Sequence, residues 1–156
     1  KMVEQSLTSL KSRLHQHCVA LVQLQLDTLQ NSLDQLMEAK NSETKSSAGD
    51  KYETGMAMIQ NQEELYKRQQ AEAKGRMNQL TSIDTERSFT AVDKGALVIS
   101  PIGVFYLAVG IGQVPMDQKE VFVLSLESPL GKSLKGKRSG DSITFNGETA
   151  PIENVL

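Results

Sequence analysis

Two carboxylates, Asp50 and Glu53, lie three residues apart where a polar stretch gives way to a helical pattern. At the start of a helix, this spacing places both side chains on one side. Mg²⁺ prefers carboxylate oxygens and keeps several of its waters, so such a pair can direct an ion, although neither residue would hold a metal ion well alone. Asp followed three residues later by Glu is also the pattern of a capping box, and both interpretations stay open.

The remaining candidate residues lack the spacing of a catalytic or metal site. His15 and His17 are two apart and face different directions on a helix, which excludes a chelating pair. Cys18 is the single cysteine, which argues against a disulfide framework and a structural zinc site. The sequence therefore predicts a chain that is not an enzyme by itself and has no cofactor of its own.

Residues 1–82 predict a helical hairpin. Apolar residues recur at steps of three or four from Leu7 to Leu36 and predict one helix over residues 3–39. Residues 40–49 are polar, have no apolar period and predict a loop. A weaker stripe from Met56 to Leu80 predicts a second helix. Two such helices bury their stripes against each other as an antiparallel coiled coil, with its tip at about residues 40–53.

Residues 83–156 hold all four prolines and most of the glycines, and they predict a sheet domain. The expected strands cover residues 96–100, 104–109, 121–126, 142–145 and 150–155. A short helix is expected over residues 129–136, with Ser128 as its N-cap and Pro129 at its first position. The fold class is therefore α+β, a coiled-coil hairpin followed by a small antiparallel sheet domain with one short helix. The expected core consists of Leu97, Ile99, Val104, Phe105, Leu107, Val109, Val121, Val123, Leu130, Leu134, Ile143, Phe145 and Ile152.

Charge and hydropathy exclude two classes of partner. The net charge of -2 provides no global field for nucleic acid, so we expect no independent DNA binding. Residues 95–114 carry no charge and have about the length of a membrane span, but Pro101 and Gly103 interrupt them. Two buried strands around a turn fit this segment better, and we expect no membrane contact. Without a recognisable leader, the expected setting is cytoplasmic.

Two sequence motifs resemble those of a known protein family. The more specific one is residues 127–141, ESPLGKSLKGKRSGD, and the other is residues 49–53, GDKYE. The first resembles the Ser-Pro-led helix, Gly-Lys turn and Gly-Asp of the Gre family of bacterial transcript cleavage and elongation factors. The second is similar to the Gly-Asp-x-x-Glu at the coiled-coil tip of that family. The resemblance implies an FKBP-like fold for the C-terminal domain.

The resemblance also implies RNA polymerase as the partner. The hairpin would enter the secondary channel of the polymerase while the C-terminal domain docks at the channel rim. Glu127, Ser128 and Pro129 would form the docking loop, with Leu130 beside them.

The implied activity is cleavage of backtracked RNA by the polymerase's own active site, which relieves arrest. Asp50 and Glu53 would share a Mg²⁺ ion with that site, and contact with nascent RNA is possible in the complex.

Two other functions stay open. Glu53 is followed by Thr54-Gly55-Met56, which departs from the family's Asn-Ala-Glu-Tyr, so a secondary-channel regulator without cleavage activity is one alternative. The other is an FKBP-like prolyl isomerase or chaperone module. An aromatic-lined pocket is expected for that activity, whereas the chain has no Trp, 4 Phe and 3 Tyr.

Overall fold

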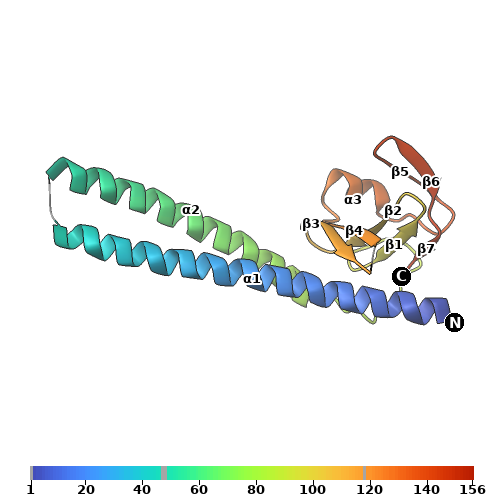
Figure 1. Ribbon diagram of the computed structural model, residues 1–156. Coiled ribbons are helices and arrows are strands. Elements are labelled where there is room, and N and C mark those ends of the chain that lie inside the picture. The colour runs from blue at the N-terminus through green and yellow to red at the C-terminus, as the bar shows by residue number, and fades with distance from the viewer. Residues whose placement is uncertain (1, 47–48, 118) are drawn as a thin grey trace. The chain divides into compact units, whose positions relative to one another are not determined.

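A computed structural model describes residues 2–46, 49–117 and 119–156, with side chains described for residues 6–42, 52–117 and 119–156 (Figure 1). Two long helices come first, α1 (Met2–Ser46) and α2 (Gly49–Thr81). Seven strands and one short helix follow. The expected α+β class, with a helical hairpin and a small, largely antiparallel sheet domain, is confirmed.

The predicted loop over residues 40–49 is wrong, because α1 continues to Ser46 and α2 already begins at Gly49. Residues 40–46 contain no glycine or proline, and their Glu, Lys and Ser side chains tolerate a helix. An apolar period is needed only where a helix is covered, so its absence did not mark the end of α1. The predicted tip residues 47 and 48 lie outside the described residues.

The distal parts of α1 and α2 form a compact hairpin unit, Ala20–Met77. Arg76 donates a hydrogen bond to Gln25 at 2.7 Å, and Gln70 donates one to Gln30 at 3.0 Å. The pairing partners run in opposite directions along the sequence, so the helices are antiparallel, as predicted (Figure 1). The buried apolar residues of this unit are Val22, Leu29, Leu33, Ile59 and Ala73.

A five-stranded sheet with the order β3-β4-β2-β1-β7 forms the centre of the rest of the chain. Its strands are β1 (Leu97–Ser100), β2 (Gly103–Leu107), β3 (Gly112–Met116), β4 (Lys119–Leu124) and β7 (Asn154–Val155). The β2–β4 pair is parallel and the other pairs are antiparallel. A separate two-stranded sheet pairs β5 (Ser142–Phe145) with β6 (Glu148–Pro151).

The sequence missed β3 and merged β6 with β7. Strand β3 is an edge strand that buries only Val114 well and contains Gly112 and Pro115, so it lacks the alternation that marks a half-buried strand. The expected strand over residues 150–155 is two strands in different sheets. Hydrogen bonds from Ile152 to Asp141 and from Glu153 to Ile99 hold the chain between them.

One face of the five-stranded sheet packs against α3 (Pro129–Leu134) and the β5–β6 hairpin. Phe105 and Leu107 of β2 are fully buried there with Leu134 and Ile143. The Phe105 ring stacks on Phe122 and meets Phe145 edge-on. The predicted core is confirmed in part. Phe105, Leu107, Leu134, Ile143 and Ile152 belong to this cluster, and Ile99, Leu130 and Phe145 are only half-buried. The other predicted residues are buried outside the cluster.

The opposite face of the sheet is equally apolar and is covered by the beginning of α1 (Figure 1). Tyr106 is fully buried on this face, and its hydroxyl lies 2.8 Å from His15 Nδ1. Lys11 donates to the carbonyls of Arg87 and Leu156, at 3.3 and 3.0 Å. Arg13 pairs with Asp117 at 2.7 Å. These contacts join α1 to four separate places in the sheet region, at Arg87, Tyr106, Asp117 and Leu156.

The boundaries of the compact units therefore differ from the boundary near residue 82, where helices give way to strands. Lys1–Val19 and Asn78–Leu156 form one compact unit, which we call the sheet unit. The physical reason is the second apolar face of the sheet. Without the first turns of α1, residues such as Leu97 and Tyr106 would face water.

We predict that the hairpin unit can be removed without unfolding the sheet unit. Deleting residues 20–77 and joining Val19 to Asn78 through a loop of about five residues should leave a cooperatively folded protein. Residues 83–156 alone should instead melt broadly or aggregate, because one sheet face is uncovered. Thermal melts followed by circular dichroism compare the two, and equal stability of both fragments would contradict the role of α1.

We also predict that acid destabilises the sheet unit through His15. Burial lowers the pKa of this histidine, and the charge on Lys11 acts in the same direction, while a hydrogen bond with the Leu80 backbone opposes them. The unfolded chain therefore takes up this proton at a higher pH than the folded chain. The free energy of unfolding should decrease as the pH falls below about 6.5 towards the lower pKa of the folded state.

Urea unfolding over this pH range tests the prediction with two matched variants. His15→Gln should reduce the dependence on pH, whereas His17→Gln, at an exposed position of the same helix, should retain it. The same slope in both variants would mean that another group is responsible.

Candidate functional site

The loop before α3 is built around two serines. Ser125 accepts two hydrogen bonds from Ser128 at its carbonyl, 3.1 Å from the amide and 2.7 Å from the hydroxyl. Its own hydroxyl accepts the Glu127 amide at 3.1 Å. Ser128 Oγ in turn accepts the Gly131 amide at 3.1 Å, which makes Ser128 the N-cap of α3 with Pro129 following it, as predicted. The loop is therefore fixed by its own hydrogen bonds.

Close packing between Gly131 of α3 and the backbone of residues 125 and 126 also fixes this loop. A Cβ atom built at this position would lie 2.1 Å from the Ser125 carbonyl oxygen, so the backbone of α3 approaches residues 125 and 126 as only glycine allows. At the other end of α3, Gly136 adopts a positive φ of 83° directly after the C-cap Lys135. The Leu-Gly-Lys and Lys-Gly-Lys steps of the 127–141 motif thus have structural reasons.

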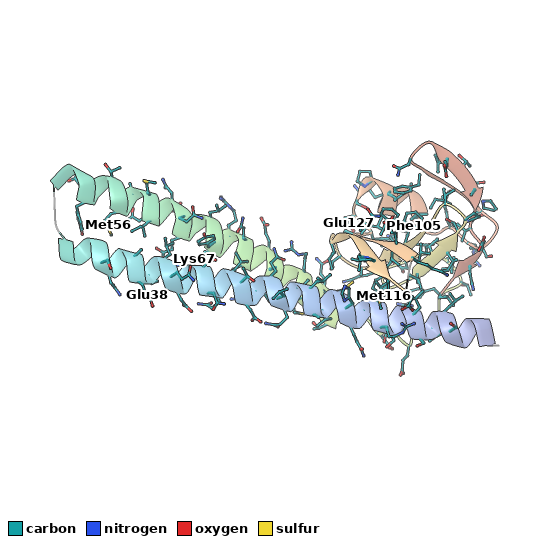
Figure 2. The ribbon with its side chains drawn as sticks, in the orientation of Figure 1. Glu38, Met56, Lys67, Phe105, Met116 and Glu127 are labelled. Carbon is teal, nitrogen blue, oxygen red and sulfur yellow. The ribbon has the colours of Figure 1, made fainter. Side chains whose placement is uncertain are left out.

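The four residues predicted to bind a partner differ in what they can offer. Glu127 and Pro129 are exposed, and Glu127 lies at the surface of the sheet unit (Figure 2). Ser128 is half-buried, and its hydroxyl is already engaged on both sides. Leu130 is half-buried against the core. Direct contact would therefore come mainly from Glu127 and Pro129, with Ser128 holding them in place.

A small hollow adjoins this loop, which the sequence did not indicate. It has a volume of about 150 Å³ and lies between Lys94 and Glu127, with Ala108 and Leu126 among its lining residues. Lys94 Nζ donates to Ser82 Oγ at 3.2 Å, which orients the ammonium group. Lys94 precedes β1, 33 positions before Glu127 in the sequence, so only the folded sheet unit brings these two opposite charges to one hollow.

Of the two tip carboxylates, the structure describes the side chain of Glu53 only. Asp50 lies in the first turn of α2, and its side chain is outside the described residues. Glu53 is exposed on the same helix. Residues three apart on a helix lie on the same side of it, so Asp50 and Glu53 occupy one side of the α2 backbone. Because α2 begins at Gly49, Asp50 lies inside the first turn and not at the N-cap that a capping box requires. Acidic residues in a first turn still favour the helix dipole.

Farther along α2, a basic side chain is paired rather than free for a ligand. Lys67, labelled in Figure 2, contacts Glu63 at 3.0 Å one turn away on α2. The hydrogen bond from Lys67 lowers the pKa of the Glu63 carboxyl. An exposed pair of this kind contributes little to stability.

The surroundings of Cys18, the remaining candidate, fit a role in packing. Cys18 is fully buried, and burial raises the pKa of its thiol to about 11, which keeps it protonated. Among the described side chains, no three of the His, Cys, Asp or Glu type converge on one point as metal ligands would. The described helices include none with the length and apolar character needed to cross a membrane.

Comparisons with known proteins found likeness in structure but none in sequence. No family model matches the sequence, and no curated protein does. A solved structure described as "Structure of the transcription factor Gfh1" is similar over 88% of this chain and 90% of that one. The sequence identity is 15% and the TM-score is 0.30, so this likeness carries no argument about family or function.

Proposed function

We propose that the chain is a Gre-like factor that binds RNA polymerase and stimulates the polymerase's own cleavage of backtracked RNA. In this proposal the loop at residues 125–131 docks at the rim of the secondary channel, and the hairpin tip enters the channel. The observation that carries the proposal is the construction of that loop, in which the most specific part of the family motif is held rigid while Glu127 and Pro129 are left exposed.

The docking loop suits a surface that must be ready before its partner arrives. Hydrogen bonds from Ser125 and Ser128, together with the close packing at Gly131, fix its backbone, so little conformational entropy is lost on binding. An exposed carboxylate and an exposed proline ring then offer one charged and one apolar contact. The adjoining hollow with Lys94 would extend the same surface with a positive charge.

The hairpin unit suits a narrow channel. Its α1 segment from Ala20 to Ser46 is roughly 40 Å long at 1.5 Å per residue. Two helices alone make a slender rod, and Asp50 and Glu53 lie near the beginning of α2.

The tip carboxylates would act on a Mg²⁺ ion held jointly with the polymerase. An ion in that position lowers the pKa of a bound water and so supplies the nucleophile for in-line attack on a phosphodiester. Asp50 and Glu53 would provide oxygen ligands, and the exposed position of Glu53 leaves it free to do so.

We predict that the docking loop can be disabled without unfolding the protein. Glu127→Ala combined with Pro129→Ala should weaken polymerase binding and shift the melting temperature by only a few degrees, because exposed substitutions usually cost less than about 0.5 kcal/mol. Glu148→Ala with Pro151→Ala removes the same side-chain types from exposed positions of β6 and serves as the control. Pull-down on core polymerase measures both, and equal retention would refute the docking assignment.

If Ser128 and Pro129 merely start a helix, stability should change instead of binding. Ser128→Ala removes the cap of α3 and should cost about 1 kcal/mol of unfolding free energy. Comparing this variant with the docking double variant separates a loss of contact from a loss of structure.

The tip is tested by removing the two negative charges while keeping the size of both side chains. Asp50→Asn with Glu53→Gln should abolish stimulated RNA cleavage, since neutral amides bind Mg²⁺ far more weakly than carboxylates. Binding to polymerase should persist, because Asn and Gln keep the size and polarity of Asp and Glu and the lost dipole interaction is only about 0.3–1 kcal/mol. Glu64→Gln with Glu72→Gln removes two exposed charges elsewhere on α2 and should keep full activity.

Three outcomes of this cleavage assay are distinguishable. Loss of cleavage in the tip variant alone supports the proposal. Equal cleavage by the parent and the tip variant would remove the metal role. No cleavage by the parent would favour the second candidate, a channel regulator, for which the Thr54-Gly55-Met56 sequence after Glu53 is the specific observation.

A further inference from the structure

A second, larger hollow lies in the sheet unit along the segment that leads from α2 to β1. Its volume is about 360 Å³, and it is lined by consecutive residues from Arg87 to Asp93 on one side and by Lys135 and Gly136 on the other. This hollow shares no lining residue with the one beside the docking loop. Neither the docking proposal nor the tip proposal uses it.

The walls of this hollow are fixed by the fold. The Val92 amide donates to the Lys137 carbonyl at 2.8 Å, and the Gly136 amide donates to the Val92 carbonyl at 2.9 Å. Phe89 anchors the other end of the segment, since its ring is buried in the core. The two sides of the hollow are therefore tied together at Val92 and do not depend on a ligand for their shape.

Positive charge in this hollow lacks an internal partner. In the described part of the chain, no carboxylate lies within ion-pair distance of Arg87 or Lys135. The Arg87 guanidinium lies 4.7 Å from the centre of the Phe89 ring, which orients it without neutralising it. The acidic residue among the lining, Asp93, accepts the Lys94 amide at 2.8 Å.

Hydroxyl donors accompany the two cations. Ser88 and Thr90 also line the hollow, and no hydrogen bond engages either hydroxyl within the described structure. Lys11 contributes a further positive charge near the hollow, because its ammonium lies 4.6 Å from the centre of the same Phe89 ring. Its pKa is lowered to about 8, mainly by burial; the Asp84 carboxylate opposes this shift, and the charge on Arg87 adds to it.

We propose that this hollow binds a small phosphate-bearing anion through Arg87, Lys135 and the hydroxyls of Ser88 and Thr90. A phosphate group accepts several charge-assisted hydrogen bonds at once, and a guanidinium can donate two of them in parallel. The hollow is larger than a single phosphate, so the ligand carries a further small group. Asp93 within it and the net charge of -2 disfavour a long polyanion such as nucleic acid.

The test titrates the full-length chain with inorganic phosphate and with pyrophosphate, followed by amide chemical shifts and by calorimetry. Amides of residues 87–93 and 135–136 should shift in a saturable manner. Lys135→Gln and Arg87→Gln should each weaken binding at least about tenfold, the size expected for losing a hydrogen bond to a charged group. Lys132→Gln removes the same charge from an exposed position of α3 outside the hollow and should bind like the parent.

Each contrary outcome overturns the proposal. Shifts that do not saturate, or shifts elsewhere on the chain, would mean screening by salt only. Equal weakening in Lys132→Gln and Lys135→Gln would show a general charge effect. Binding of a short RNA oligonucleotide at this hollow without binding of either phosphate would assign it to nucleic acid instead. Because Arg87 also packs on Phe89, its substitution could weaken binding through a loss of stability. The Arg87→Gln result is therefore used only if this variant melts at the same temperature as the parent. If it melts lower, the Lys135→Gln result alone tests the proposal.

Discussion

Both faces of the five-stranded sheet are apolar, and the need to cover the second one organises the rest of the structure. Buried Phe105 and Leu107 point to the side of α3, while buried Leu97 and Tyr106 point to the side of α1. A buried tyrosine hydroxyl must find a partner, because an unpaired one costs about 1–3 kcal/mol. His15 supplies that partner from α1. The beginning of α1, up to Val19, is thereby part of the sheet unit, although the rest of α1 belongs to the hairpin unit.

This arrangement makes one uninterrupted helix common to both compact units. Residues up to Val19 of α1 are held by the sheet, and the same helix continues into the hairpin unit without a glycine or proline. The polar pairs between Gln30 and Gln70 and between Gln25 and Arg76 fix the register of the rod.

The surface chemistry is local because the net charge is small. The docking loop, the hollow beside Lys94 and the hollow beside Lys135 each bring together a few polar groups on a rigid backbone. In each case packing holds the backbone and leaves particular side chains exposed. Recognition by such a chain would depend on preformed geometry rather than on long-range attraction.

The sequence by itself determined the features that have a local cause. The helix period of Leu10, Leu14 and Cys18, the Ser128 cap and the strand at residues 142–145 all follow from propensity and short-range hydrogen bonds. It misplaced the end of α1 and missed β3, because an uncovered helix and an edge strand need no apolar pattern. Tertiary structure alone decided that α1 belongs to the sheet unit, that β2 lies parallel to β4, and that Lys94 and Lys135 line hollows. Those features join residues far apart in the chain, and no local pattern records which distant surface a side chain will meet.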